Sequence, residues 1–345
     1  MTVVHVDGAS GYAAGELIRL LAEHPAFEIG WLGSTSSAGT PVGSVFGGLA
    51  PLGLTFGAAE QLVEKVRAGD AVVFAGEAER APRRVAQFLG RGARVVDLSA
   101  AFRLRDLGAY RRWYGFQHSR PALVAEAAYG LPELHAEQIR AARLVANPGC
   151  YPTATLLALA PLARTYAGRI ACIAVDAKSG ITGAGRTPKV SSLYAEVEGG
   201  VRPYAAGDHR HMPEIAEQLE RLGLGVPFGF VPHVVPLSRG LLATCYVWFS
   251  RSTPRSDELV RLYEDTYGRH SLVQVLQPGE LPETRAVART ARACIGTARI
   301  GPDLVVAACA IDNLGKGASA QALQNLNIMF GHAEESGLDA LATVA

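Results

Sequence analysis

A single cysteine stands between a tight turn and a long apolar run in the segment VANPGCYPTATLLALAPL, residues 145–162. The apolar run predicts a helix, so the Cys150 thiol is expected at the start of that helix. The positive end of the helix dipole favours the thiolate, which is the nucleophilic form of cysteine. Buried cysteines in apolar segments are usually inert, so this position leaves open both a nucleophile and a structural thiol.

A nucleophilic cysteine needs a base, and the segment GDHRHMPEI offers two histidines. His209 and His211 lie beside charged residues in a loop that leads to a helix, which is a poor context for core histidines. His233 lies in a predicted strand and is interpreted as structural. A His-x-His pair can also bind a metal, but no third ligand of suitable type clusters with it, so no metal is predicted.

A glycine-rich turn near the N-terminus predicts a dinucleotide site. The stretch GASGYAAG, from Gly8 to Gly15, follows an apolar strand and opens a helix. Gly8 permits the tight turn, Gly11 lets a pyrophosphate approach the backbone, and the helix N-terminus faces the phosphates. The spacing is G-x-x-G-x-x-A rather than the full G-x-G-x-x-G, so an ordinary strand-to-helix turn is the alternative.

The end of the second strand favours NADP(H) over NAD(H) as cofactor. The segment LGSTSSAG, residues 32–39, contains no carboxylate to hold a ribose 2′-hydroxyl. Ser34, Thr35 and Ser36 are hydroxyl donors for a 2′-phosphate, and a serine-rich loop without a ligand is the alternative. A thiolate, an imidazole and a nicotinamide together define one chemistry, in which a thioester forms and hydride reduces it to an aldehyde.

The order of elements predicts two domains in an α/β protein. Strands alternate with helices from TVVHVD to ARVVDLSAAF, which indicates a parallel, Rossmann-type sheet. After Cys150, long strands in IACIAVDAKSG, in residues 225–250 and in LVVAACAIDN indicate a second α+β domain on a mixed, largely antiparallel sheet. KGASAQALQNLNIMFG predicts a final amphipathic helix. We assign residues 1–149 to a dinucleotide-binding domain and 150–312 to a catalytic and dimerisation domain, with residues 313–345 returning to the first.

Composition excludes several classes of protein. The 345 residues carry a formal net charge of +1 with no basic block, which argues against nucleic-acid or anionic-membrane partners. Apolar runs are interrupted well before the roughly 18 residues that a membrane helix needs. The N-terminus lacks the features of a signal peptide. Five widely spaced cysteines without a CxxC pattern indicate free thiols and a cytoplasmic protein.

Several motifs in order carry a resemblance over essentially the whole chain: GASGYAAGELIRLL, DLSAAFRL, YRRWYGFQH, YGLPEL, ANPGCYPTA, DAKSGITGAGR, HRHMPEI, PHVVPLSRG and IDNLGKGASAQALQNLN. The chain resembles the N-acetyl-γ-glutamyl-phosphate reductase family. The resemblance implies a Rossmann domain for NADP and a catalytic domain like those of aspartate-semialdehyde and glyceraldehyde-phosphate dehydrogenases. It also implies NADPH-dependent reduction of N-acetyl-γ-glutamyl phosphate to the 5-semialdehyde through a cysteine thioester, the third step of arginine biosynthesis, and homodimers or homotetramers.

The resemblance also assigns residues. Cys150 would be the thioester-forming nucleophile and His209 the catalytic histidine, with His211 as the less favoured alternative and as a substrate contact. The remaining positions are cofactor contacts at Gly8, Ala9, Ser10, Gly11, Tyr12, Ser34, Thr35, Ser36, Ser179, Gly180, Gly183 and Asn313, and anion-binding candidates at Arg103, Arg186 and Arg239. For Arg103 and Arg239 an ordinary ion pair is the alternative.

The chain departs from the usual family pattern at three places. Glu79 and Arg80 stand where His-Gly is usual, Ala101 replaces a carboxylate, and Thr35 replaces a common arginine. Four alternatives accompany the reductase hypothesis, and the departures suggest the last of them. These are a lysine-pathway reductase of carrier-linked aminoadipyl phosphate, an aspartate-semialdehyde dehydrogenase, a Cys-His acyl hydrolase, and a binding module without catalysis.

Overall fold

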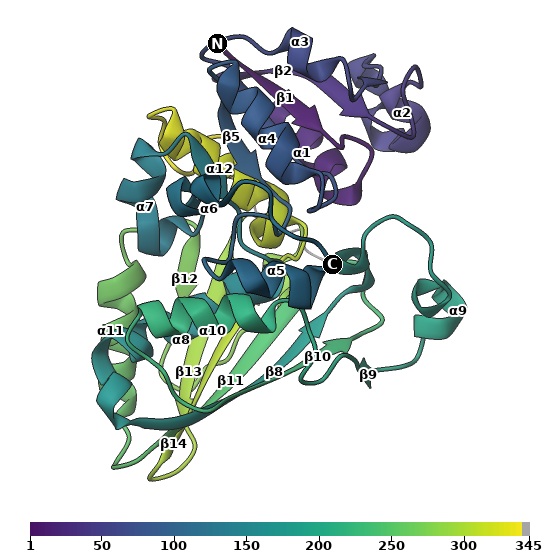
Figure 1. Ribbon diagram of the computed structural model, residues 1–345. Helices are drawn as coiled ribbons and strands as arrows, with labels where there is room; N and C mark the ends of the chain where they lie inside the picture. Colours follow the sequence, from purple (N-terminus) through teal and green to yellow (C-terminus); the bar gives the residue numbers. More distant parts are fainter. Residues whose placement is uncertain (340–345) are drawn as a thin grey trace. The chain divides into compact units, whose positions relative to one another are not determined.

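A computed structural model describes residues 1–339 and divides into two compact units, residues 1–148 with 318–339 and residues 149–317. The first unit contains a seven-stranded, all-parallel sheet (Figure 1). Its strands are β1 (Thr2–Asp7), β2 (Phe27–Ser34), β3 (Gly57–Ala58), β4 (Ala71–Phe74), β5 (Arg94–Asp97), β6 (Ala128–Tyr129) and β7 (Leu144–Ala146). Their order, β3-β2-β1-β4-β5-β7-β6, is that of a doubly wound fold with its reversal between β1 and β4.

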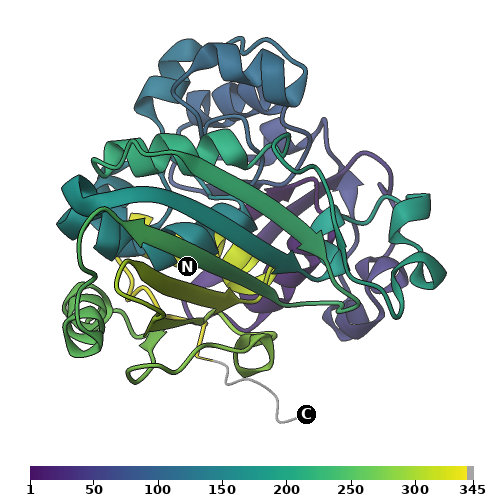
Figure 2. The same ribbon diagram turned by 90° about the horizontal axis from the view of Figure 1, so that it is seen from below.

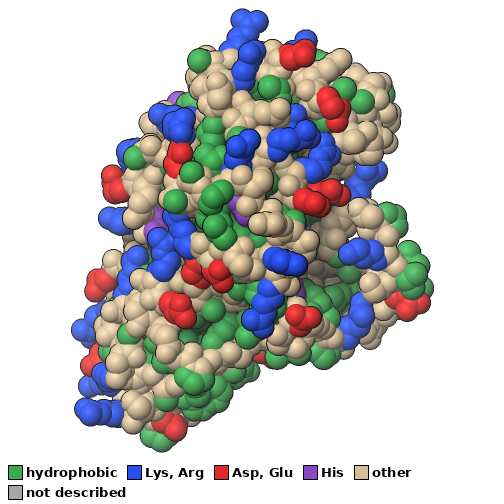
Figure 3. All heavy atoms as spheres, viewed as in Figure 1, with side chains coloured by type: hydrophobic (Ala, Val, Ile, Leu, Met, Phe, Trp, Pro, Cys, Tyr) green, Lys and Arg blue, Asp and Glu red, His purple; other side chains and the backbone are tan. Residues whose placement is uncertain are grey.

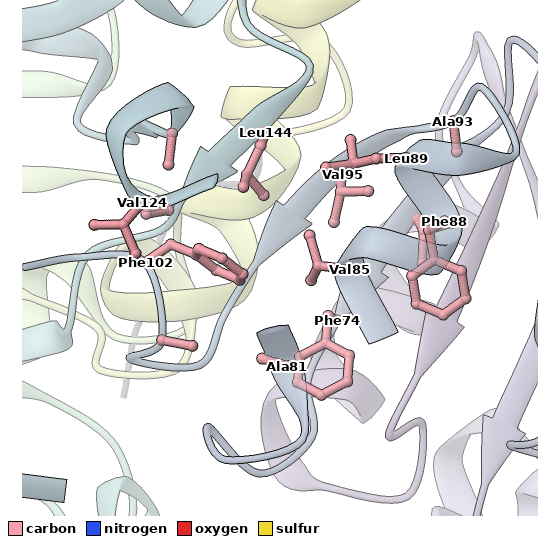
Figure 4. Close-up of a cluster of buried hydrophobic side chains, with 14 of the residues drawn as sticks. Phe74, Ala81, Val85, Phe88, Leu89, Ala93, Val95, Phe102, Val124 and Leu144 are labelled. Atoms are coloured by element: carbon pink, nitrogen blue, oxygen red, sulfur yellow. The ribbon is translucent and has the colours of Figure 1, made fainter. Parts of the chain in front are cut away.

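Helices connect and cover these strands. They are α1 (Tyr12–Ala22), α2 (Val42–Val45), α3 (Leu62–Lys65), α4 (Ala81–Gly90), α5 (Leu107–Tyr114), α6 (Pro121–Glu126), α7 (Pro132–Ala141) and α12 (Ala320–Met329). Figure 4 shows how α4 contributes to the core: Val85 lies between Phe74 of β4 and Val95 of β5, and Phe88 belongs to the same buried cluster. All four side chains are buried, and each buried aliphatic or aromatic side chain contributes roughly 1.5–3 kcal/mol through removal from water.

The second unit is built on a seven-stranded mixed sheet in the order β12-β13-β14-β11-β8-β10-β9. Its strands are β8 (Ile170–Ser179), β9 (Arg202–Pro203), β10 (Phe228–Val234), β11 (Leu241–Phe249), β12 (Val273–Val275), β13 (Ala293–Arg299) and β14 (Leu304–Ile311). Its helices are α8 (Cys150–Tyr166), α9 (Tyr194–Val197), α10 (Met212–Arg221) and α11 (Ser256–Tyr267). Buried and half-buried residues alternate along β11, and α8 packs on β11 and β14, so the sheet has one face in the core.

The predicted fold class is confirmed, including a mixed sheet in which β10 runs parallel to β8 and β11 runs antiparallel to it. Two details of the prediction are wrong. Residues 225–250 form two strands rather than one, because a turn with Pro236 and Gly240 (φ +123°) separates β10 from β11. The sequence analysis also omitted β13, which pairs with β14.

The last helix is not amphipathic, since every residue of α12 is buried. Its amide N–H groups find acceptors inside the unit: the Gln321 and Asn325 side chains both donate to the carbonyl oxygen of Gly130. Residues 313–317 belong to the second unit and 318–339 to the first, whereas we predicted that the whole of 313–345 returns. Residues 340–345 of that prediction lie outside the described residues.

Two further observations concern membrane-spanning helices and surface charge. Among residues 1–339, no helix combines the length and apolar character that crossing a bilayer requires. Acidic and basic side chains are interspersed on the face drawn in Figure 3, as the formal charge of +1 leads one to expect.

Candidate active site

The second unit presents Cys150 at the start of a helix, as the apolar run predicts. Cys150 is the first residue of α8, and its preceding N-cap residue, Gly149, has no side chain to cap the helix. The thiol is partly exposed. The backbone N–H of Gly149 donates to Oε1 of Glu214 over 3.0 Å, and Glu214 is fully buried. A buried carboxylate from α10 therefore fixes the turn that presents the cysteine.

Cys150 opens into a pocket of about 450 Å³ within the second unit. Six of the residues singled out from the sequence line it together: Cys150, Ser179, Gly180, Gly183, His209 and His211. The sequence analysis missed other lining residues, among them Tyr151, Tyr204, Lys189, Arg202 and Arg210. Tyr151 and Arg210 lie within the quoted ANPGCYPTA and HRHMPEI motifs and Lys189 follows DAKSGITGAGR closely, whereas Tyr204 and Arg202 belong to no quoted motif.

His209 sits in a largely apolar, aromatic environment. Its ring centroid lies 5.5 Å from the centroids of Tyr151, Tyr204 and Phe230. Only 8 % of the residue is exposed. Burial, followed by the nearby Arg210 guanidinium, lowers the pKa of His209 from 6.5 to about 4. The imidazole is therefore neutral at neutral pH.

A backbone hydrogen bond fixes which nitrogen of His209 carries the proton. The N–H of His211 donates to Nδ1 of His209 over 3.1 Å, so Nδ1 is an acceptor and the neutral ring carries its proton on Nε2. Nε2 lies 3.4 Å from the Tyr204 hydroxyl, which in turn donates to the Tyr151 hydroxyl over 3.3 Å. Burial raises the pKa of both tyrosines, so both hydroxyls stay protonated.

His211 occupies a different position beside the cysteine turn. A Cβ built on Gly149 would lie 2.5 Å from Nε2 of His211, so only glycine fits there. The ring centroids of His211 and His209 are 4.9 Å apart. Both histidines thus belong to the pocket, one against the turn before Cys150 and one against the tyrosine pair.

A buried carboxylate organises the turn on the other side of the cysteine. Asp312 is fully buried, and it accepts hydrogen bonds from Nε and Nη2 of Arg239 over 2.8 to 3.1 Å. It also accepts the backbone N–H groups of Leu314 and Gly315, each over 2.8 Å. For Arg239 the structure therefore shows an ion pair, which was the alternative to an anion clamp.

Asn313 and Gly317 extend this arrangement to the pocket. The Asn313 side chain accepts from the N–H of Gly240 over 2.8 Å and donates to Oγ1 of Thr182 over 2.9 Å, next to Gly183. A Cβ on Gly317 would lie 2.8 Å from Cβ of Cys150. The close approach of Gly317 thus leaves no room for a side chain on that side of Cys150.

The first unit brings the predicted dinucleotide residues together. Gly8 has φ +90°, and a Cβ there would lie 2.7 Å from the carbonyl carbon of Ala75. Gly11 caps α1 without a side chain, which leaves the first backbone N–H groups of the helix for an anion. The Ser34 hydroxyl donates to the Ser10 hydroxyl over 3.0 Å, so the turn and the end of β2 are adjacent. Backbone donors and hydroxyls of this kind fit a phosphorylated dinucleotide.

The remaining predicted residues lie outside the pocket around Cys150. Ala9 lies in the glycine-rich turn between β1 and α1, Tyr12 is the first residue of α1, and Thr35 and Ser36 follow β2. Arg103, in the turn after β5, is buried and donates through Nη2 to the Leu98 carbonyl over 2.8 Å. Arg186 is exposed in the loop after Gly185 and is not among the pocket-lining residues.

Comparison with known proteins gives the class first. A model described as "Semialdehyde dehydrogenase, NAD binding domain" matches residues 3–142. A model described as "Semialdehyde dehydrogenase, dimerisation domain" matches residues 150–313. Among solved structures, aspartate semialdehyde dehydrogenase II from Vibrio cholerae, complexed with ASA, has a TM-score of 0.72 at 16 % identity, with 96 % of this chain and 98 % of that chain covered. The Candida albicans enzyme with NADP has a TM-score of 0.66 at 16 % identity, with 95 % and 99 % covered.

Curated relatives narrow the class. Proteins named N-acetyl-gamma-glutamyl-phosphate reductase are similar over nearly full length: 43 % identity in Thiobacillus denitrificans and 45 % in Azotobacter vinelandii, each with 98 % of both chains covered, and 44 % in Alkalilimnicola ehrlichii with 100 % of both covered. The chain belongs to the N-acetyl-γ-glutamyl-phosphate reductase family, within the semialdehyde dehydrogenases. The resemblance drawn from the sequence motifs is thereby confirmed.

The lowered pKa of His209 predicts a measurable dependence of stability on pH. Between pH 6.5 and about 4 the unfolded chain binds a proton at this position and the folded chain does not. The free energy of unfolding therefore falls as the pH drops through that window. Asparagine does not titrate in this range, so His209→Asn should lack this pH dependence. We expect the difference in unfolding free energy between pH 7.5 and pH 5 to be smaller in the variant than in the wild type, by on the order of 1–2 kcal/mol. Urea titrations of both proteins at the two pH values test this. An identical difference in both proteins would contradict the burial-lowered pKa.

Proposed function

We propose that this protein uses NADPH to reduce N-acetyl-γ-glutamyl phosphate to N-acetylglutamate 5-semialdehyde, with release of phosphate, and that Cys150 carries the acyl group. The observation that carries this proposal is the helix-start cysteine, which opens into a pocket with a neutral histidine and three basic residues. The reductase name of relatives at 43–45 % identity supports the same reaction and favours it over aspartate-semialdehyde or carrier-linked aminoadipyl substrates.

The first step is attack by the Cys150 thiolate on the acyl carbon. A C–S bond forms, and the C–O bond to phosphate breaks as phosphate leaves with the electron pair. The N-terminus of α8 favours the thiolate, and the Gly149–Glu214 hydrogen bond holds the turn during the attack. NADPH, when bound, supplies the hydride that reduces the resulting thioester. Collapse of the reduced adduct then releases the aldehyde and returns Cys150 as a thiolate.

His209 has a different role in this proposal from the acid–base role that the sequence suggests. Because Nδ1 accepts a backbone N–H, the neutral ring offers its Nε2–H as a hydrogen-bond donor. Acyl transfer and reduction each pass through an oxyanion, and a fixed donor beside that oxygen stabilises both transition states. A pKa of about 4 suits this role, since the ring stays a neutral donor through neutral pH.

Substrate anions have cationic partners in the same pocket. Lys189, Arg202 and Arg210 line it, and phosphate and carboxylate groups bind such cations through charge-assisted hydrogen bonds. We propose that these three, rather than the Asp312-paired Arg239, supply the anion contacts within the second unit. Arg103, Arg186 and His211 remain candidates from the family resemblance.

The nucleophile is tested by Cys150→Ser. A serine hydroxyl ionises far less readily than a thiol and is a poorer leaving group, so we expect turnover to fall by at least ~10³. The assay is phosphate-dependent reduction of NADP⁺ with N-acetylglutamate 5-semialdehyde, the reverse reaction. Near-normal turnover in the serine variant would exclude the covalent mechanism. Acyl-phosphate cleavage without NADPH oxidation in the wild type would instead indicate a hydrolase.

The donor role of His209 is tested by His209→Ala. Loss of one fixed donor to an oxyanion typically lowers the rate by ~10²–10³, and we expect a fall of that size in kcat with little change in NADPH binding. The wild-type kcat should show no ionisation near pH 6.5 that disappears in the variant. Such an ionisation would indicate that His209 acts as an acid–base group instead. A larger fall in kcat in His211→Ala than in His209→Ala would assign the donor role to His211.

We further propose that the protein is a cytoplasmic homodimer or homotetramer that associates through the second sheet. Its face away from α8 carries the half-buried side chains of Ala174, Tyr246 and Trp248, the last two stacked at 6.2 Å. In Figure 2 the strands of this sheet lie in front, with no helix over them. Apolar side chains on an uncovered sheet face favour association. We expect Trp248→Glu to shift the protein to a smaller species in sedimentation velocity. A wild-type protein that sediments as a monomer would contradict the proposal.

A further inference from the structure

A basic side chain from α4 reaches the end of β2 in the first unit. Arg80 is the residue before α4, and its Nη1 donates to Oγ1 of Thr35 over 3.2 Å. Thr35 directly follows β2. One turn further along the helix, Arg84 is buried in an ion pair with Asp7 over 2.8 Å and also donates to a backbone carbonyl. The two arginines thus differ in environment: the Arg84 side chain is buried in the core, whereas that of Arg80 is partly exposed at the surface.

The end of β2 is where a doubly wound domain distinguishes the two nicotinamide cofactors. In this fold the ribose of the adenosine lies beyond the second strand, and a residue there contacts either a 2′-hydroxyl or a 2′-phosphate. Around Thr35 the side chains are hydroxyls: the Ser34 hydroxyl donates to Ser10 over 3.0 Å, and those of Ser10 and Ser36 are 3.4 Å apart. The Arg80 guanidinium therefore stands beside a group of hydroxyls at the position that reads the 2′ substituent.

The present partners of Arg80 are weak enough to be exchanged for a phosphate. Thr35 offers a neutral hydroxyl, and the nearest carboxylate oxygen, Oε1 of Glu60, is 3.8 Å from Nη2. The side chains of Arg80 and Glu60 are 38 % and 68 % exposed, and exposed pairs of this kind contribute roughly 0–1 kcal/mol. A phosphate with up to two negative charges accepts two parallel hydrogen bonds from a guanidinium and is a much stronger partner.

We propose that Arg80 determines the preference for NADP(H) by pairing with the 2′-phosphate of the cofactor, with Thr35 orienting the guanidinium. Glu60 opposes this preference, because its carboxylate competes for the guanidinium and repels the phosphate. The inference rests on the proposed function only in taking NADP(H) as the cofactor. Arg80, at the start of α4, thus provides the positive charge that the hydroxyl residues after β2 lack.

The test measures binding rather than turnover. NADPH, NADH, 2′,5′-ADP and 5′-AMP are titrated by calorimetry into the full-length wild type and into Arg80→Gln. We expect the variant to bind NADPH and 2′,5′-ADP about 10- to 100-fold more weakly, while NADH and 5′-AMP change by less than about threefold. Arg83→Gln is the matched control, since Arg83 is exposed on the same helix and its loss removes the same charge.

A second variant acts in the opposite direction. Glu60→Gln removes the competing carboxylate and should bind NADPH about two- to fivefold more tightly, with NADH binding unchanged. This gain does not arise from a disturbed fold, which lowers affinity for every ligand. Arg80→Lys should recover part of the NADPH affinity, because it restores the charge without the planar pair of donors.

Three results would overturn the proposal. Equal losses of NADPH and NADH binding in Arg80→Gln would make Arg80 structural. Equal NADPH losses in Arg80→Gln and Arg83→Gln would reduce the effect to general charge. Unchanged NADPH affinity in Arg80→Gln would show that Arg80 does not contact the cofactor. A wrong cofactor assignment gives a different result from a wrong role for Arg80, since the wild type itself would then bind NADH as tightly as NADPH.

Discussion

The second unit depends on one buried ion pair. Asp312 has no exposed surface, and a carboxylate in that environment requires charge and hydrogen bonds in compensation. Arg239 supplies the charge, and the N–H groups of Leu314 and Gly315 supply further donors. Because these donors come from two separate segments, the pair fastens the corner before β11 to the turn after β14. That turn ends at Gly317, which lies against Cys150. Removal of Arg239 would leave the buried Asp312 carboxylate without its counter-charge, in the turn that packs against Cys150.

Burial is the main influence on the ionisation of one histidine and two tyrosines of the pocket. Desolvation is the largest influence on His209, Tyr151 and Tyr204, and it favours the neutral form of each. The pocket therefore combines neutral hydrogen-bond donors near the cysteine with basic side chains in its lining. Such a combination suits an anionic acyl phosphate, whose charge is balanced by cations while a neutral donor stabilises the developing oxyanion.

The dinucleotide unit separates structural from functional charge in a similar way. On α4, Arg84 is buried against Asp7 and holds the helix to the end of β1, where the glycine turn begins. Arg80, one turn earlier, keeps an exposed guanidinium beside the hydroxyls that follow β2. Burial decides the difference, since a buried pair is costly to open and an exposed pair is readily exchanged.

The sequence alone determined the fold class, the cysteine at the helix start and the glycine turn, because each depends on local pattern. Apolar periodicity and the Asn-Pro-Gly turn fix the start of α8, and Gly8 is required by a positive φ within a few residues of chain. The motifs also carried the family assignment. Local pattern misjudged α12, whose glutamines and asparagines suggested a solvated face, because only the tertiary structure places Gly130 where their amides can donate.

Contacts between distant segments decided the rest. Whether Arg239 binds a ligand or Asp312 depends on two residues 73 positions apart, and no spacing rule predicts such a pairing. The tautomer of His209 follows from the fold of its own loop, and its lowered pKa follows from packing against Tyr151 and Phe230. The contact between Arg80 and Thr35 joins residues 45 positions apart. The sequence thus determined which chemical groups are present, and the tertiary structure decided their partners and their charge, because desolvation and pairing exist only once the chain is packed.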